Sequence, residues 1–149
     1  MNRGPSRPGK VRISPPSTTN MSEAMRALII RAPYVDWILD GKKAWELRGG
    51  ATKLRGRIGL IEKGAGVVVG TCELVRVHGP LTRAALRTNA AKMNASPDEF
   101  DGDLYYGDHT YAWELAAPRR LPRPVRYEHP AGAVIWVKLT DEVRAQVGE

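Results

Sequence analysis

Three ionisable side chains, Lys43, Glu46 and Arg48, lie within six consecutive residues of this 149-residue chain. Arg48 can donate two parallel hydrogen bonds to a phosphate group or to the edge of a base. Glu46 can accept from an exocyclic amine or hold Lys43 in place. Lys43 becomes a general base only where burial or nearby positive charge lowers its pKa. The sequence leaves open whether Lys43 and Glu46 are catalytic or whether the three side chains form an ion network that only joins two strands.

Glu99 is a weaker candidate for an acid–base partner of Lys43. It ends the segment Ser96-Pro97-Asp98-Glu99, in which a capping hydroxyl, a proline and two carboxylates predict the start of a helix. That role explains the carboxylates without any catalysis. His109 is a candidate for lining a cleft, but a histidine in such a loop is more often exposed to solvent.

The three histidines and the one cysteine lack the spacing of metal ligands, so we expect no metal and no cofactor. Cys72 has no partner for an intramolecular disulfide, and its apolar surroundings predict a buried thiol. The chain has no apolar run of about eighteen residues, and its N-terminus lacks the apolar region of a secretory signal. We therefore expect a monomeric, cytoplasmic protein without a membrane-spanning helix.

The chain carries 23 Lys and Arg residues against 16 Asp and Glu, a net charge of +7. This excess favours polyanions as partners, so we predict binding to RNA or single-stranded nucleic acid, or to a nucleotide or nucleoside. Such ligands are held by cations and by aromatic rings on which bases stack. The candidate binding residues are Lys43, Arg48, Lys53, Arg55 and Arg57, a second basic set at Arg119, Arg120, Arg123 and Arg126, and the rings of Tyr34, Tyr105, Tyr106 and Tyr111. The tryptophans predicted to fill the core instead are Trp37, Trp45, Trp113 and Trp136.

The residues before the charged group predict a strand and a short helix. Residues 26–31 form an apolar run suited to a strand, and Pro33 suits the first position of a helix. Gly41 suits the left-handed residue that ends that helix. A helix of about eight residues does not persist alone, so it must pack against the rest of the fold.

After this helix the pattern alternates with a period of two. Trp45 and Leu47 share one face of the predicted strand, and Glu46 and Arg48 share the other. We expect the apolar face to enter the core and the charged face to line a cleft.

The remaining chain predicts further strands with short helices between them. The expected strands are 57–61 and 67–77, joined by a hairpin at 63–66, then 111–115 and 133–139. The expected helices are 81–93 with a break near Asn89, a short one from Ser96, and a last one from Thr140. Prolines at 118, 122, 124 and 130 predict an irregular arm before the last strand.

This order predicts a mainly β fold with short helices, an α+β barrel whose ends are covered by helices. Residues 1–24 are rich in Pro, Ser, Arg and Gly, and we expect them to form a disordered basic tail. Residues 25–149 are expected to form a single domain.

The segment from Arg31 to Arg48 resembles the opening of ASCH domains. Their pattern is a Pro-aromatic pair, a short helix and then Gly-x-Lys-x-x-Glu-x-Arg, which residues 41–48 match at every specified position. The resemblance covers residues 26–139 and includes Arg55-Gly56-Arg57, residues 111–115, Pro124-Val125 and Ile135-Trp136. It implies a PUA-like β-barrel, a superfold shared by several RNA-binding modules, and an association with RNA or single-stranded nucleic acid.

The resemblance also leaves an enzyme open. Some relatives are similar to small amidohydrolases that deacetylate N4-acetylcytidine nucleosides, and some ASCH proteins are linked to ribonuclease activity. Those amidohydrolases carry a threonine where this chain has Glu46, and Met93 stands near the position of their partner carboxylate. We therefore expect a nucleic-acid-binding module first, a hydrolase of modified nucleosides or a ribonuclease second, and a protein-interaction domain third.

Overall fold

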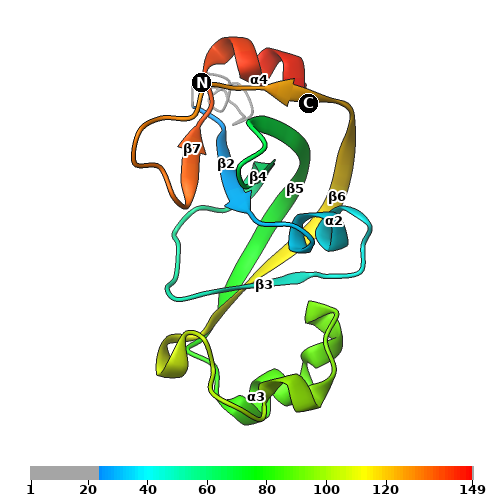
Figure 1. Cartoon of the computed structure of the whole chain (residues 1–149), viewed down its shortest axis with the longest axis vertical. Coiled ribbons are helices and arrows are strands. Elements are labelled where there is room, and N and C mark those ends of the chain that lie inside the picture. Colours follow the sequence, from blue (N-terminus) through cyan, green and yellow to red (C-terminus); the bar gives the residue numbers. More distant parts are fainter. Residues whose placement is uncertain (1–23, 149) are drawn as a thin grey trace, which may run out of the picture.

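The computed structural model describes residues 24–148, and the predicted tail lies outside them except for residue 24. Its framework is one six-stranded sheet in the order β3-β6-β5-β4-β2-β7. The strands are β2 (Arg26–Ile30), β3 (Trp45–Arg48), β4 (Gly56–Glu62), β5 (Val67–His78), β6 (Tyr111–Arg126) and β7 (Trp136–Lys138). Strands β2 and β4 pair in parallel and the other pairs are antiparallel. The sheet curls into a half-barrel (Figure 1), so the predicted mainly β fold is confirmed.

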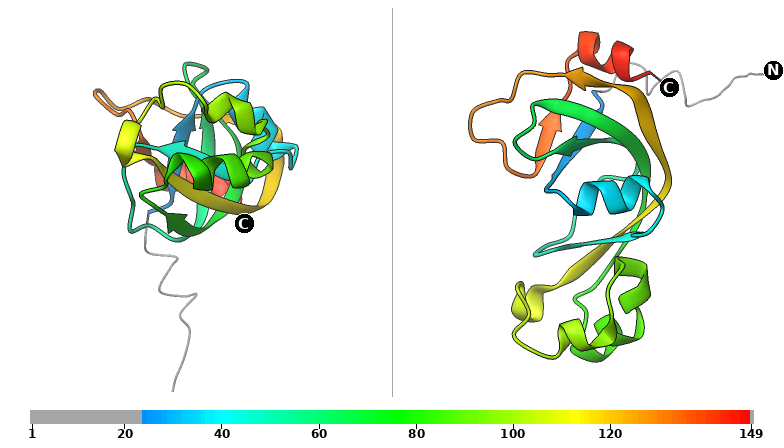
Figure 2. Two further views of the ribbon diagram at one scale, coloured as in Figure 1. Left: turned by 90° about the horizontal axis from the view of Figure 1, so that it is seen from below. Right: turned by 45° about the vertical axis from the view of Figure 1, so that its right-hand side comes forward.

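Short helices cover both ends of the half-barrel, as predicted. The helices of residues 24–148 are α2 (Tyr34–Leu39), which lies beside the middle of the sheet, α3 (Arg83–Thr88), α4 (Asp141–Val147) and the 3₁₀ helices η2 (Ala90–Met93), η3 (Pro97–Phe100) and η4 (Gly107–His109). Helix α4 lies at one end, and α3 with the 3₁₀ helices forms a layer at the other (Figures 1 and 2). No helix within residues 24–148 is long and apolar enough to cross a membrane.

The core consists of three clusters, each of which fixes one helical element to the sheet. Val147 holds α4 against one half of the sheet, and Val35 with Ile38 holds α2 against the middle. Trp45 of β3 packs with Leu86 of α3 and so joins the helical layer to the half-barrel. Burial of each large aliphatic side chain contributes about 1.5–3 kcal/mol, so these few contacts are enough to position the short helices.

Strand β6 corrects one prediction. Three of the prolines expected in an irregular arm, at positions 118, 122 and 124, lie instead within this continuous strand. The register with β5 shifts at three places, and two of these shifts leave the residues between Ala116 and Arg119 and those between Arg120 and Val125 without a partner on β5. A proline costs nothing to the sheet where no N–H is required, and a bulge provides such positions.

Several other local predictions are confirmed. A hairpin joins β4 to β5, the helix after residue 81 breaks at Asn89, and Ser96 begins a helix with a capping box. The Cys72 thiol is buried, and burial raises its pKa to about 12. The last strand is shorter than the predicted 133–139, because only Trp136–Lys138 pairs with β2.

Candidate functional site

The end of α2 fixes the position of Lys43. Gly41 has the predicted left-handed conformation, with φ of +80°. Its N–H donates to the Ile38 carbonyl at 3.0 Å, and the Lys42 N–H donates to the Trp37 carbonyl at 2.8 Å. This pair of hydrogen bonds is the Schellman arrangement that ends a helix. The Lys43 N–H also donates to the Trp37 carbonyl, at 3.1 Å, and the Lys43 residue is only 7% exposed.

Lys43 is a buried amine with a lowered pKa. Its Nζ donates to the Trp45 carbonyl at 2.7 Å and lies 3.6 Å from Glu46 Oε1 and 5.6 Å from the centre of the Tyr34 ring. Burial lowers the pKa of Lys43, the carboxylate of Glu46 opposes this effect, and the charge of Arg48 adds to it. Burial is the largest of these effects, which the sequence alone did not determine.

Glu46 connects Lys43 to Arg48. Arg48 Nη2 lies 3.1 Å from Glu46 Oε2 and donates to the Ile29 carbonyl of β2 at 2.8 Å. Its guanidinium carbon lies 5.6 Å from the centre of the Trp113 ring. Its buried Nε has no hydrogen-bond partner among residues 24–148. The three charged side chains therefore form the ion network that was one of the two interpretations of the sequence.

Strand β3 presents its two faces as the alternation predicts. Trp45 and Leu47 pack with the helical layer, and the Trp45 ring stacks on His78 with 4.6 Å between ring centres. Glu46 and Arg48 face the other way. Both are largely buried, so the charged face is part of the interior and not an open surface.

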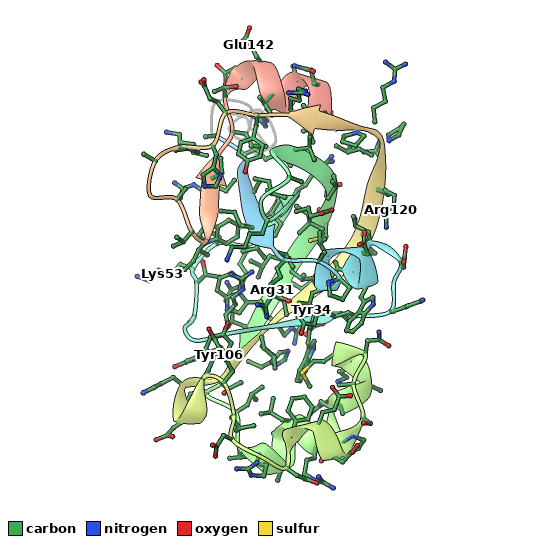
Figure 3. The ribbon with its side chains drawn as sticks, in the orientation of Figure 1. Arg31, Tyr34, Lys53, Tyr106, Arg120 and Glu142 are labelled. Carbon is green, nitrogen blue, oxygen red and sulfur yellow. The ribbon has the colours of Figure 1, made fainter. Side chains whose placement is uncertain are left out.

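A cleft of about 400 Å³ lies between the half-barrel and the helical layer. The basic side chains that line it are Arg31, Lys43, Arg48 and Lys63, and the acidic ones are Glu46 and Glu99. The aromatic lining side chains are Tyr34, Trp37, Phe100, Tyr105 and Tyr106. Figure 3 shows Arg31 and Tyr34 next to β3, with Tyr106 on the side of the helical layer. Four cations against two carboxylates give the lining a positive formal charge.

The ASCH domain family model matches residues 28–124, which is more than half of the chain. The chain belongs to the ASCH family. Its PUA-like fold follows from this membership. A comparison with curated proteins found no match.

The fold of this ASCH domain is similar to that of the ASCH protein from Zymomonas mobilis. That crystal structure has 15% identity and a TM-score of 0.62, over 83% of this chain and 92% of the other. A Ser-to-Ala variant of the same protein has 16% identity and a TM-score of 0.61, over 84% and 94%. A Tyr-to-Phe variant has 15% identity and a TM-score of 0.59, over 84% and 96%. At such low identity the likeness concerns the fold alone.

Five of the predicted site residues of this ASCH domain line the cleft together: Lys43, Glu46, Arg48, Tyr34 and Glu99. Glu99 comes from η3, far from the motif in the sequence. Its Oε2 accepts a hydrogen bond from the Ser96 N–H at 2.9 Å, so the carboxylate caps its helix and also faces the cleft. Two further predicted rings, Tyr105 and Tyr106, lie on the same lining.

Four predicted binding residues do not line this cleft. Lys53 is exposed in the loop between β3 and β4 (Figure 3). Arg55 and Arg57 line a separate pocket of about 250 Å³ near α4, where Arg57 Nη2 donates to the Gly148 carbonyl at 3.2 Å. Tyr111 lies at the start of β6 against Gly79.

The second basic set lies along β6, away from the cleft. All four of its arginines, at positions 119, 120, 123 and 126, are exposed. Arg120 pairs with Asp36 at 3.5 Å and with Asp40 at 3.1 Å and so holds α2 beside the strand (Figure 3). His109 is exposed in η4 and does not line the cleft. In residues 24–148 we find no group of three or more His, Cys, Asp or Glu side chains that could hold a metal ion.

Two exposed cations of the cleft, Arg31 and Lys63, were missed as binding residues. Arg31 directly follows β2 and Lys63 directly follows β4, and the Lys63 N–H donates to the Ile30 carbonyl at 2.9 Å. Because β2 and β4 are parallel, their carboxyl ends meet at one edge of the sheet. The parallel pairing of β2 and β4 therefore brings Arg31 and Lys63 together, and the order of elements in the sequence did not predict this pairing.

Half of the predicted tryptophan core is fully buried. Trp45 and Trp113 are buried, whereas Trp37 and Trp136 are half-buried. Trp37 lines the cleft, and Trp136 stacks on Trp113 with 5.8 Å between ring centres. Trp37 thus lies between the core of the ASCH domain and its cleft, and Trp136 lies on the edge strand β7.

Proposed function

We propose that the cleft binds one nucleotide of RNA or of another single-stranded nucleic acid. The observation that carries this proposal is that two exposed cations, Arg31 and Lys63, and two half-buried rings, Tyr34 and Tyr106, line the same cleft. Cations hold phosphate groups, and tyrosine rings accept stacked bases. The cleft volume of about 400 Å³ is near the lower end of the usual range of ligand sites, about 300–1,000 Å³, which suits a single nucleotide.

In this proposal the charged side chains of the motif have a supporting role. Lys43, Glu46 and Arg48 are already paired with one another, so they line the cleft as an ion network. The exposed cations at the rim, Arg31 and Lys63, meet the phosphates. The excess of cations over carboxylates in the lining favours a phosphodiester over a neutral ligand.

The test is a binding measurement by fluorescence anisotropy with a labelled single-stranded RNA of about six nucleotides, repeated over a range of salt concentrations. Arg31→Ala is compared with Arg123→Ala, an exposed arginine of β6 outside the cleft. Lys63→Ala is compared with Lys138→Ala, an exposed lysine of β7. Each cleft variant should weaken binding more than its control and reduce the salt slope by about 0.7.

Two outcomes contradict the proposal. One is the absence of binding by the unmodified protein at low salt. The other is an equal loss of affinity in cleft variants and controls, which would show that the RNA senses only net charge.

A second function is favoured by one observation, the lowered pKa of Lys43 in a cleft that also holds Glu99. An amine of this kind can act as a general base at a pH where an ordinary lysine is protonated. Neutral Lys43 would take a proton from a water molecule that attacks the carbonyl carbon of an acylated nucleoside. The C–N bond then breaks, the proton passes to the nucleoside nitrogen, and a carboxylic acid is released.

The hydrolase is tested with a panel of acylated nucleosides, N4-acetylcytidine first, and protein in excess of substrate. Chromatography detects the deacylated nucleoside. Product formation that disappears in Lys43→Met, with an unchanged circular dichroism spectrum, supports the hydrolase. If the protein forms no product from any member of the panel, this second function is rejected and the binding proposal is unaffected.

A further inference from the structure

Tyr105 is an almost fully exposed aromatic residue at the rim of the cleft. It is 91% exposed, although it lines the same cleft as the half-buried Tyr106. The two rings are 4.8 Å apart between centres and perpendicular, at 90°. Tyr106 is therefore the more buried ring of the pair, and the ring of Tyr105 is open to solvent.

Exposed apolar side chains gather at this rim. In residues 24–148 four large hydrophobic side chains are exposed, namely Val75, Tyr105, Val134 and Ile135. Tyr105 and Val134 both line the cleft, although one precedes η4 and the other precedes β7. Ile135 directly follows Val134. Single exposed apolar residues need no explanation, but an apolar group at the mouth of a cleft marks a contact surface for a ligand.

The exposed ring of Tyr105 contributes little to the packing of the fold. Tyr106 packs against the loop after β3, because a side chain at Gly49 would come within 2.8 Å of the Tyr106 ring. Burial also raises the pKa of the Tyr106 phenol. Among residues 24–148 the Tyr105 ring makes one contact with another aromatic ring, the edge contact with Tyr106. Its ring is thus available to a ligand without any change in the fold.

The size of the cleft limits what it can hold. A volume of about 400 Å³ suits one nucleotide, so the next nucleotide of a strand must lie outside, at the rim. Single-stranded nucleic acids can splay adjacent bases apart and stack each on a different ring. Tyr106 and Tyr105 are adjacent in sequence, and in the lining of the cleft the first is half-buried and the second is exposed.

We propose that Tyr105 stacks the base next to the one in the cleft, so that the ligand of this site is an oligonucleotide of at least two nucleotides and not a free nucleotide or nucleoside. This inference rests on the proposed binding function. It adds the prediction that chain length, and not only the identity of one base, determines affinity. It also separates the two candidate functions, because a free modified nucleoside has no second base to stack on Tyr105.

The test compares the affinities of adenosine 5′-monophosphate, the dinucleotide pApA and a single-stranded hexa-adenylate, with a uridine series in parallel. Calorimetry measures each ligand with the unmodified protein and with Tyr105→Ala, Tyr105→Phe and Tyr106→Ala. Because Tyr105 is exposed, its replacement leaves the fold intact. Stacking of one base on an aromatic side chain corresponds to a loss of about 5- to 150-fold on alanine substitution.

We expect Tyr105→Ala to weaken binding of the dinucleotide and of the hexamer by this factor and to affect the mononucleotide, which has no second base, much less. Tyr105→Phe should retain the unmodified affinity for all three, because the ring is kept. Tyr106→Ala should weaken all three ligands, because its ring lies inside the cleft.

The inference is overturned if the dinucleotide binds no more tightly than the mononucleotide, or if Tyr105→Ala binds the longer ligands as well as the unmodified protein does. In both cases the mononucleotide still binds and the proposed function stands. If none of the ligands binds to the unmodified protein, the proposed function fails and the inference fails with it.

Discussion

Arg48 of β3 donates a hydrogen bond from Nη2 to the carbonyl oxygen of Ile29 in β2, at 2.8 Å. These two strands are not neighbours, because β3 is one edge of the sheet and β2 lies next to the opposite edge. The Arg48 side chain thus joins two strands of the half-barrel that do not pair with each other. The same guanidinium pairs with Glu46, so Arg48 both lines the cleft and joins β3 to β2.

Replacement of Arg48 by methionine should lower the free energy of unfolding by about 3 kcal/mol, because it removes one partner of a largely buried ion pair. Arg48→Lys should recover only part of this loss. An ammonium group does not reproduce the planar donors that reach Glu46 and Ile29. Urea denaturation followed by circular dichroism measures both variants.

Arg123→Met is the matched control for this experiment, because Arg123 is exposed on β6. Its effect should stay within about 0.5 kcal/mol, as for most surface substitutions. The double variant Arg48→Met with Glu46→Gln should cost less than the sum of the single variants, because both remove the same pair. Strict additivity would show that Arg48 and Glu46 do not act together.

Gly41→Ala should destabilise the protein by about 1–2 kcal/mol, because Gly41 has φ of +80° and a β-carbon is unfavourable in that conformation. Gly50→Ala is the matched control. Gly50 also has open space around an added β-carbon, but it does not have a left-handed conformation. Its effect on the free energy of unfolding should stay within about 0.5 kcal/mol. Equal effects at the two positions would remove the conformational explanation of the helix end.

The pKa of Lys43 predicts a specific dependence of stability on pH. Burial lowers this pKa in the folded protein, so the unfolded chain binds the proton more tightly than the folded protein does. Stability rises with pH wherever the unfolded state holds more protons. The contribution of Lys43 should therefore increase between its lowered pKa and about 10.4, the ordinary value for lysine.

Lys43→Met isolates this contribution. The difference in unfolding free energy, unmodified protein minus variant, should become more favourable to the unmodified protein as the pH rises from neutrality toward about 10. Below the lowered pKa the difference should be constant. A difference that stays constant over the whole range, or that falls with pH, would mean that burial does not lower the pKa of Lys43.

Local signals in the sequence predicted the structure of the motif. The alternation of Trp45 with Glu46 fixes which side chains face the core, and Gly41 identifies the end of the helix. Each of these depends on neighbouring residues only, and the structure bears out both. The parallel pairing of β2 and β4 is a long-range contact, so the sequence did not predict that Arg31 and Lys63 meet.

The same reason explains which candidate residues the cleft omits. Arg55 and Arg57 follow the motif closely in sequence, but the chain carries them to a pocket beside α4. Glu99 is remote in sequence, yet the helical layer brings it into the cleft. The degree of burial of Lys43 likewise depends on the packing of that layer against β3, which residue types alone do not reveal.

Titration of Tyr106 offers a direct report on occupancy of the cleft. Burial raises the pKa of its phenol, the charge of Arg48 opposes this and the carboxylate of Glu46 adds to it. A base stacked on the ring would remove more water, and its phosphate would disfavour the phenolate, so a bound nucleotide should raise this pKa further. The near-ultraviolet absorbance of the unmodified protein minus that of Tyr106→Phe gives the titration of this residue alone.

Tyr127 is the control: burial raises its pKa too, but it lies outside the cleft, so saturating adenosine 5′-monophosphate should leave its titration unchanged. A nucleotide that binds without moving the titration of Tyr106 would place its site elsewhere on the molecule.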